Sequence, residues 1–164
     1  MMSVYEIHAA DTENLLRIAR LSRKRSQDWA LANIPEDLLD QYKPRTASDE
    51  EEADFIAVDL RHHPDEHLLV AEVDGIIVAY VHVGIYGTGA DRQIQHAEPP
   101  YVDCTSPQSE TAYKSLLGMV EDIAHAADVK SISLYASTDD LPANIALVES
   151  GYIARTTQYQ KILL

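Results

Sequence analysis

The chain has 164 residues, with 13 Lys and Arg against 27 Asp and Glu, so its formal net charge is −14. Its length, a hydrophobic content of 46% and a single cysteine predict one soluble domain over residues 1–164, without disulfides or a multi-cysteine metal site. The longest apolar run is too short to span a bilayer, the N-terminus lacks a signal-peptide pattern, and nucleic-acid binding requires clustered Lys and Arg. We therefore expect a cytoplasmic protein with no affinity for nucleic acid or membrane.

Residues 1–62 predict one strand followed by helices. Alternating polarity at Val4–Ile7 predicts a short strand, and Pro35 at a first-turn position predicts the start of a short helix. Ser48 and Glu51 form a capping box, and the acidic run 49–52 suits the positive end of a helix dipole. The predicted helices extend from Asp11 or Thr12 to about Asp28 or Trp29, from Glu36 to Tyr42, and from Ser48 to His62.

The clearest signal of secondary structure is a β-hairpin. The β-rich runs His67–Val73 and Ile76–Tyr86 flank Asp74-Gly75, a dipeptide that favours the two positive φ angles of a type I′ turn. The further predicted elements are a loop over Gly87–Ala97, a strand over Tyr101–Thr105, a helix over Gln108–Ala127, a strand over Lys130–Ala136, a helix over Asp139–Ser150 and one or two strands over Tyr152–Leu163. This order predicts an α/β fold with a mixed, mostly antiparallel central sheet flanked by helices.

The long helix begins at a stretch of sequence that carries a family resemblance. Its N-terminal residues are Gln108, Ser109, Glu110, Thr111, Ala112 and Tyr113, and Leu116-Leu117 follow on the helix. From His67 onward the chain resembles the GNAT superfamily of acetyl-CoA-dependent N-acetyltransferases, and Val4–Asp28 loosely resembles its opening strand and helix. In that family a strand leads to R/Q-x-x-G-x-G/A at the start of a helix, where backbone N–H groups bind the CoA pyrophosphate. The resemblance places this role on residues 108–113, although Thr111 and Tyr113 replace the two small residues.

Residues 140–152 resemble a second motif of the same family, N-x-x-A-x-x-x-Y-x-x-x-G-F. The matching residues are Ala143, Gly151 and Tyr152. Asp140 replaces the asparagine, and the resemblance places it in the cofactor site. Leu147 stands where many members carry the tyrosine that protonates the CoA thiolate, and an apolar side chain cannot donate a proton. Solvent, Tyr152 or Tyr159 would have to supply this proton.

Direct attack of an amine on a thioester needs a base and backbone donors for the oxyanion. The resemblance implies that the backbone of Val102, Asp103 and Cys104 pairs with the pantetheine arm of CoA. It also implies a base on the same strand or on the preceding hairpin, and the candidates are Glu98, His96 and His82. The alternatives are that Glu98 is a solvated carboxylate before two prolines and that His82 is a hydrogen-bonded sheet histidine.

Three further features have less specific interpretations. Cys104 is either a nucleophile or a small buried residue. The histidines at 62, 63 and 67 are candidate metal ligands, but Pro64 breaks the helix that would place two of them on one face, so no metal site is predicted. The basic residues 17–25 form either a solvated helix face or a contact to the CoA 3′-phosphate or an acidic partner.

The sequence leaves three hypotheses about function. The first is an N-acetyltransferase that moves an acetyl group from acetyl-CoA to a primary amine of a small molecule or peptide. The charge of −14 favours a cationic amine such as a polyamine, an aminoglycoside or a lysine side chain. The second is a catalytically inactive GNAT-fold binding or regulatory module, in which Tyr113 or Tyr101 fills the notch between the strands at Val102–Cys104 and Ser131–Ala136. The third is an unrelated α/β domain. Two copies could also form a homodimer through the C-terminal strand.

Overall fold

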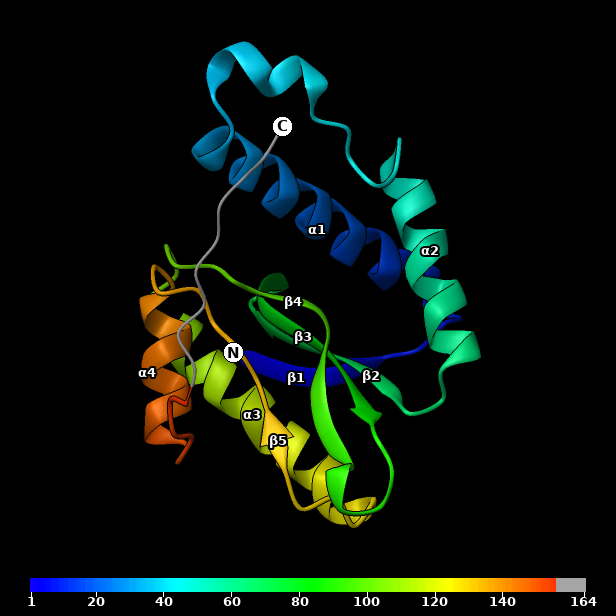
Figure 1. Cartoon of the computed structure of the whole chain (residues 1–164), viewed down its shortest axis with the longest axis vertical. Coiled ribbons are helices and arrows are strands. Elements are labelled where there is room, and N and C mark those ends of the chain that lie inside the picture. The colour runs from blue at the N-terminus through cyan, green and yellow to red at the C-terminus, as the bar shows by residue number, and fades with distance from the viewer. Residues whose placement is uncertain (156–164) are drawn as a thin grey trace. The chain divides into compact units, whose positions relative to one another are not determined.

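The computed structural model describes residues 1–155, which fall into two compact units. The first unit combines Met1–His8 with His62–Ile153, and the second is centred on Ala9–Arg61. Figure 1 labels the helices and strands of both units. No helix within residues 1–155 is both long and apolar enough to cross a membrane.

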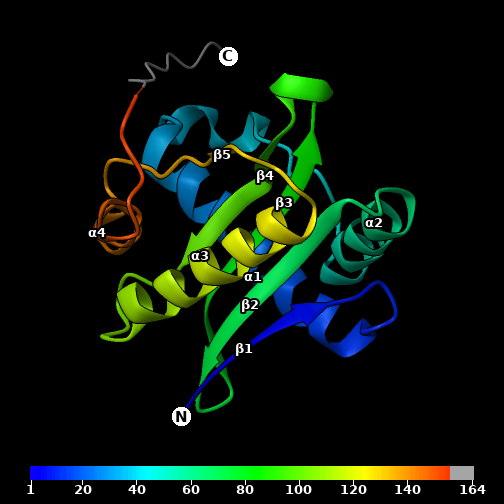
Figure 2. The same ribbon diagram turned by 90° about the horizontal axis from the view of Figure 1, so that it is seen from below.

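The first unit is built on a mixed β-sheet whose strands lie side by side in chain order (Figure 2). Its strands are β1 (Met2–Ile7), β2 (Glu66–Val73), β3 (Ile76–Tyr86), β4 (Gln93–Val102) and β5 (Ile132–Ser133). Strands β1 to β4 pair antiparallel, and β5 pairs parallel to β4. The predicted α/β fold with a mixed, mostly antiparallel sheet is confirmed.

The β2–β3 hairpin closes at the predicted turn. Asp74 and Gly75 have φ angles of 51° and 81°, the two positive values that a type I′ turn requires. Further along the hairpin the register shifts by one residue, because Glu72 pairs with Ile77 whereas Ala71 pairs with Ala79. Val78 is therefore an extra residue on β3, and this bulge decides which side chains share a face of the sheet beyond it.

Helix α3 (Ser109–Ala126) packs along one face of this sheet, and α4 (Leu141–Glu149) packs against α3 (Figure 2). The core between them contains Val81 and Val83 from β3 and Leu116 and Leu117 from α3, all 1% exposed or less. The apolar spacing of the predicted helix Gln108–Ala127 therefore faces the sheet as expected. After α4, Gly151 adopts a φ of 88° and the Tyr152 N–H donates to the Leu147 carbonyl (3.0 Å), which ends this helix at the predicted glycine.

Several predicted boundaries between β4 and the C-terminus are wrong. The loop predicted over Gly87–Ala97 ends earlier, at Arg92, and β4 begins at Gln93. Ile94 is fully buried between the more exposed Gln93 and Gln95, which is the alternation typical of a strand. The predicted strand over Tyr101–Thr105 is only the end of β4, which already includes Pro99 and Pro100. The predicted strand over Lys130–Ala136 is reduced to β5, since only Ile132 and Ser133 pair with β4. Residues 152–155 form no strand, and the rest of the strand prediction for Tyr152–Leu163 lies outside the described residues.

The second unit contains the helices predicted for the N-terminal third. They are α1 (Thr12–Asn33), the 3-10 helix η1 (Glu36–Gln41) and α2 (Asp49–His62), so α1 extends past its predicted end near Trp29. At the start of α2 the Glu51 N–H donates to Ser48 Oγ (3.1 Å), which confirms one half of the capping box. The Glu51 carboxylate accepts its bond from the Ala47 N–H (2.9 Å) rather than from Ser48.

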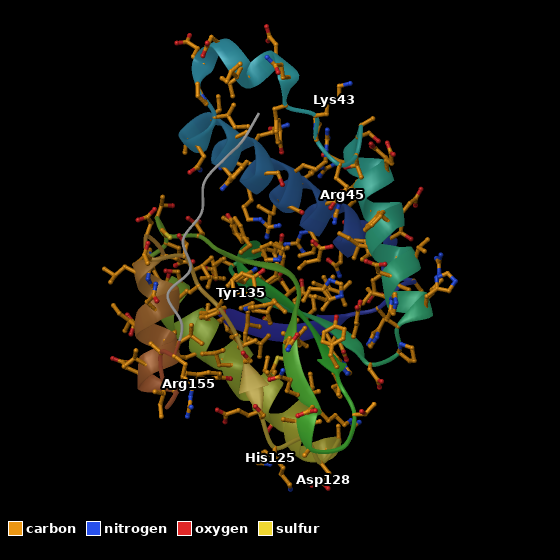
Figure 3. All side chains as sticks on the ribbon, in the orientation of Figure 1. Lys43, Arg45, His125, Asp128, Tyr135 and Arg155 are labelled. Atoms are coloured by element: carbon orange, nitrogen blue, oxygen red, sulfur yellow. The ribbon has the colours of Figure 1, made fainter. Side chains whose placement is uncertain are left out.

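Glu52 has a role that the acidic run did not indicate. Its side chain is buried and accepts hydrogen bonds from Thr46 Oγ1 (2.8 Å) and Ser22 Oγ (3.3 Å). It also pairs with the guanidinium of Arg45, the residue labelled in Figure 3, and this guanidinium lies 4.3 Å from the centre of the Phe55 ring. Glu52 therefore connects α1, the segment before α2 and α2 itself inside the second unit.

Candidate functional site

Strand β4 is irregular where it passes Glu98. Glu98 is the ladder partner of His82, but the neighbouring pairs are His96 with Val83 and Tyr101 with Tyr80. Ala97 and one of the two prolines are therefore extra residues on β4, which makes two bulges around Glu98. Proline lacks an N–H for a ladder, and bulges are among the few places in a sheet that accept it. The Pro99-Pro100 pair thus fits a strand that bends at this point.

Strands β4 and β5 part beyond a very short ladder. They pair only through Ile94 with Ile132 and Gln95 with Ser133. At the next position the His96 Nε2–H donates to the Tyr135 carbonyl (3.2 Å), and the two rings make an edge contact with centroids 4.6 Å apart. Figure 2 shows the segment after β5 running away from β4 toward α4. Within residues 1–155 the ladder therefore ends at Gln95.

The end of β4 directs its backbone groups to two different sides. The Asp103 N–H donates to the Val78 carbonyl (2.8 Å), which continues the contact with β3. Because successive residues of a strand present their backbone groups to opposite edges, Val102 presents its N–H and carbonyl away from β3. The Asp103 side chain then accepts hydrogen bonds from the Thr105 N–H (3.0 Å) and Thr105 Oγ1 (2.6 Å), which turns the chain toward α3.

The N-terminus of α3 follows this turn. Gln108 is the N-cap, and its N–H donates to Ser106 Oγ (3.3 Å) while the Ser109 N–H donates to the Ser106 carbonyl (3.3 Å). The next N–H groups, of Glu110 and Thr111, belong to the first turn, where helix geometry provides no intrahelical acceptor. Together with the helix dipole, these donors can bind an anion.

Two side chains at the start of α3, those of Glu110 and Tyr113, bear on this anion site. Glu110 places its carboxylate 3.2 Å from Lys114 Nζ, and Lys114 also pairs with Glu149 of α4, so two carboxylates share one ammonium. The Tyr113 side chain is fully buried in the core with Leu147, Ala143 and Ala146. Burial raises the pKa of the Tyr113 hydroxyl, with smaller effects of Asp140, Tyr152 and Tyr135, so this side chain extends toward the segment after β5 and the N-cap of α4. The second tyrosine expected to fill a notch, Tyr101, stacks on Tyr80 of β3 with ring centroids 5.6 Å apart.

Comparison with known proteins identifies the fold. No sequence model of a protein family matches the chain, and no curated protein matches it by sequence. Several solved acetyltransferase structures do match in three dimensions. A predicted acetyltransferase from Clostridium acetobutylicum with acetyl-CoA superposes with a TM-score of 0.62 at 16% identity, over 99% of this chain and 96% of that one. Glucosamine-6-phosphate N-acetyltransferase from Arabidopsis thaliana gives 0.65 at 14%, over 99% and 98%. Ribosomal-protein-alanine N-acetyltransferase from Brucella melitensis gives 0.61 at 20%, over 99% of both chains.

The chain has the GNAT fold. At these low identities the likeness establishes the fold alone, and it removes the hypothesis of an unrelated α/β domain. Within the GNAT fold of this chain, the sequence-predicted site residues fall into two groups. One group lies at the end of β4 and the start of α3, and the other lies on the sheet around Glu98 and His82.

Asp140 and Cys104 meet at the edge of the first group. Asp140 is the N-cap of α4, where its Oδ1 accepts from the Ala143 N–H (3.1 Å), and the Cys104 Sγ lies 3.7 Å from the same oxygen. Cys104 is exposed, so the expectation of a small buried residue is wrong. Partial burial and the Asp140 carboxylate raise the pKa of the Cys104 thiol, which disfavours the thiolate that a nucleophile needs. Burial likewise raises the pKa of Asp140.

Of the two tyrosines that are candidates for donating a proton to the CoA thiolate, the structure describes Tyr152. Leu147 is a core residue of α4. Burial, with a smaller effect of Glu121, raises the pKa of Tyr152 to about 12, and the Tyr152 hydroxyl is buried without a hydrogen-bond partner among the described residues. Tyr159 lies outside the described residues. Solvent and Tyr152 therefore stay as the alternatives within residues 1–155.

The second group forms a row of polar side chains on the sheet face opposite α3. His82 is 2% exposed, and its Nε2 lies 3.0 Å from Glu66 Oε2 on β2. The other oxygen of Glu66 accepts a hydrogen bond from the Tyr86 hydroxyl (3.0 Å). Glu98, the half-buried ladder partner of His82, is on β4. His82 is thus a hydrogen-bonded sheet histidine, with the Glu66 carboxylate at hydrogen-bond distance and Glu98 as its ladder partner.

His96 lies next to this row, at the place where β4 and β5 part. Burial lowers the pKa of His96 from 6.5 to about 4, and the charge of His82 acts in the same direction. Its hydrogen bond to the Tyr135 carbonyl raises the pKa by a smaller amount. At neutral pH the His96 imidazole is therefore uncharged, and its Nε2–H donates to the Tyr135 carbonyl.

The remaining candidates have structural partners. The His67 ring pairs with Glu6 on β1, and His63 Nδ1 lies 4.0 Å from Glu66 Oε1. Among residues 1–155 no group of three or more His, Cys, Asp or Glu side chains is placed to hold a metal ion. In the basic segment, Arg23 and Arg20 pair with Asp49 at 2.9 and 3.5 Å, which is a contact between two helices of the second unit.

Glu66 and Tyr86 are the site residues that sequence reasoning missed. The predicted strand began at His67, one residue too late, so Glu66 was left outside the hairpin. The period of two could have assigned both residues to a face of the hairpin. Glu66 is two residues before Leu68 on β2, and Tyr86 is four residues after His82 on β3, so the members of each pair share a face. It could not have brought Glu66 to the face of His82, because that depends on the bulge at Val78.

Proposed function

We propose that this protein is an N-acetyltransferase that moves an acetyl group from acetyl-CoA to a primary amine by direct attack. The observation that carries the proposal is the parting of β4 from β5, directly before the N-terminus of α3, in a GNAT fold. We further propose that the two compact units act as one acetyltransferase domain, since the acetyltransferase structures match 99% of the chain.

Acetyl-CoA fits the donors at the end of β4 and the start of α3. We propose that the first-turn N–H groups of Glu110 and Thr111 bind the pyrophosphate, with Gln108, Ser109, Ala112 and Tyr113 shaping the helix start. The Lys114 ammonium, which also pairs with Glu149, offsets part of the repulsion from Glu110. Val102 supplies backbone groups for the pantetheine arm, whereas the Asp103 N–H already donates to β3. The Clostridium relative, whose crystals contain acetyl-CoA, supports this assignment.

The transfer needs three changes of bonding. A base removes one proton from the ammonium of the acceptor, and the amine lone pair forms a C–N bond with the thioester carbonyl carbon. The nitrogen of the tetrahedral intermediate loses its second proton to solvent, the C–S bond breaks, and the CoA thiolate takes a proton from solvent or Tyr152. Glu98 and His82 are the proposed base and its neighbour, because they lie as ladder partners at the bulged centre of β4.

The chemical class of the acceptor follows from charge. The chain carries a net charge of −14, which attracts cations over distances comparable to the Debye length. Solved relatives include an aminoglycoside acetyltransferase in complex with sisomicin, which is an amine of this class. We propose a cationic primary amine as the acceptor.

Calorimetric titration of the purified protein with acetyl-CoA and with free CoA tests the cofactor site. We expect micromolar binding of both. The variant Thr111→Pro removes one first-turn N–H, so we expect affinity to fall about tenfold or more. Glu50→Pro, in the first turn of α2, is the matched control and should bind like the unmodified protein.

No binding at millimolar CoA would contradict the acetyltransferase proposal. That result would favour the alternative of a catalytically inactive binding or regulatory module, which the replacements Thr111, Tyr113 and Leu147 otherwise suggest. Binding with equal affinity in Thr111→Pro would instead place CoA elsewhere on the protein.

A further inference from the structure

His96 connects β4 to the segment after β5 through its side chain instead of its backbone. The ladder between the two strands ends at Gln95 and Ser133 within residues 1–155. At the next residue the His96 Nε2–H donates to the carbonyl of Tyr135, which is labelled in Figure 3, over 3.2 Å. The two rings also make an edge contact with centroids 4.6 Å apart. The imidazole therefore lies where the strands part, and two contacts with Tyr135 hold it there.

The His96 ring is held in one orientation. Its Nδ1 is buried without a hydrogen-bond partner among the described residues, although buried polar atoms normally have one. A rotation that broke the bond to Tyr135 would leave Nε2 unpaired as well, which adds a second cost of the same kind. His96 as a whole is only partly buried, so part of its surface is accessible. A group that came to lie against His96 would therefore meet a fixed ring.

A bulge places His96 and Glu98 on opposite faces of the sheet. His96 pairs with Val83, which packs in the core with α3. Glu98 pairs with His82, the preceding residue of β3, which projects to the other face. The extra residue Ala97 accounts for this change of face. His96 therefore belongs to the face that carries the proposed CoA site, whereas Glu98 belongs to the face that carries the proposed base.

The proposed CoA site gives the acyl donor a direction along β4. In that proposal the pyrophosphate binds at the start of α3, and the pantetheine arm contacts Val102 at the end of β4. The arm then follows β4 back toward Glu98, where the thioester meets the amine. His96 is two residues before Glu98 and lies on the face from which the donor comes. Because the acyl group is the far end of the donor, it is the part that meets His96.

We propose that the imidazole of His96 closes the inner end of the acyl site and limits the transferred group to acetyl. This inference rests on the proposed function. An acetyl group ends at its methyl, whereas propionyl and butyryl groups carry one and two further methylenes. These methylenes would have to displace a ring that Tyr135 holds in place. Discrimination by one methylene changes kcat/KM by about 10- to 200-fold in enzymes.

The test compares acetyl-CoA, propionyl-CoA and butyryl-CoA as donors to a panel of spermidine, sisomicin and a lysine peptide. In the unmodified protein we expect kcat/KM to be at least about 100-fold higher for acetyl-CoA than for butyryl-CoA. In His96→Ala this ratio should fall by about tenfold or more, because removal of the ring leaves room for the longer chain. Gln95→Ala is the matched control. It changes the neighbouring residue of β4, whose side chain projects to the other face, and should leave the ratio unchanged.

The variant His96→Phe separates the shape of the ring from its hydrogen bond. Phenylalanine keeps a planar ring but cannot donate to the Tyr135 carbonyl, and Nδ1 has no described partner to lose. We therefore expect His96→Phe to keep the preference of the unmodified protein for acetyl-CoA. A preference lost equally in His96→Phe and His96→Ala would overturn the proposal, because the hydrogen bond rather than the ring would then determine it.

Two measurements do not depend on turnover. In calorimetric titration without an amine, butyryl-CoA should bind the unmodified protein about tenfold or more weakly than acetyl-CoA, and His96→Ala should reduce this difference. In NMR spectra of the unmodified protein, acetyl-CoA should shift the ring signals of His96 more than free CoA, which lacks the acyl group.

The results that contradict the role of His96 differ from those that contradict the proposed function. Equal use of acetyl-CoA and butyryl-CoA by the unmodified protein would overturn the role of His96. The same ratio in His96→Ala and Gln95→Ala, or equal NMR shifts with acetyl-CoA and free CoA, would also overturn it. If the unmodified protein binds neither CoA nor any acyl-CoA, the proposed function itself has failed, and the role of His96 fails with it.

Discussion

At the edge where β4 and β5 part, the environment of His96 opposes protonation. One ring nitrogen donates to the Tyr135 carbonyl, and the other, Nδ1, is buried without a hydrogen-bond partner among the described residues. A second proton would have to sit on that buried nitrogen. This is the physical reason for the lowered pKa of about 4.

The lowered pKa predicts a pH-dependent stability. In the unfolded chain His96 takes up a proton near pH 6.5, whereas in the folded protein it does so only near pH 4. Between these values the unfolded state binds more protons, so the free energy of unfolding falls as the pH falls. We expect His96 to account for a loss of about 2 kcal/mol between roughly pH 7 and pH 5.

Urea denaturation of His96→Gln at the two pH values checks this expectation. The variant should lose less stability on acidification than the unmodified protein. His125→Gln, which changes an exposed histidine in the last turn of α3 (Figure 3), is the control. An equal acid response in all three proteins would show that folding does not lower the pKa of His96.

At the scale of elements, the β2–β3 hairpin shows how a local signal and a non-local outcome differ. The Asp74-Gly75 turn is predicted by its two residues and forms as predicted. A hairpin continuing from that turn without irregularity would pair Glu66 with Val83, which faces α3. The extra residue at Val78 shifts the register, so Glu66 instead shares a face with His82.

Two glycines test the turn and α3 with the same substitution. Gly75 has a φ of 81°, whereas Gly118 is in the middle of α3, and a Cβ at either position would meet no atom within 4 Å. Contacts of the added methyl group therefore do not contribute to the difference in stability between the two variants. We expect Gly75→Ala to lower the free energy of unfolding by about 1 kcal/mol, because alanine is strained at positive φ.

The opposite effect is expected for Gly118→Ala. Alanine is the better helix former, so the free energy of unfolding should rise by about 0.5–1 kcal/mol. Urea denaturation curves with unchanged slope measure both variants. A stabilising Gly75→Ala would mean that the turn adopts another conformation in solution.

At the scale of the whole molecule, the excess of acidic residues acts on every charged ligand. The net charge of −14 favours the encounter with a cationic acceptor, and salt screens this attraction. We expect the KM for spermidine to rise severalfold between about 20 mM and about 500 mM salt. An arylamine that is uncharged at neutral pH serves as the control, and its KM should not follow the same trend. Equal salt responses of the two amines would contradict electrostatic attraction of the acceptor.

The sequence by itself determined the features whose causes are local. The Asp74-Gly75 turn, the apolar face of α3 and the glycine that ends α4 each depend on a few adjacent residues, and their order along the chain indicated the GNAT fold. Only the tertiary structure decided which distant side chains meet. Glu66 reaches His82, Glu98 becomes its ladder partner, and Glu52 joins Arg45 and Ser22 because of strand register, single-residue bulges and helix packing. A one-residue shift exchanges the faces of a strand, and no local preference in the sequence specifies such a shift.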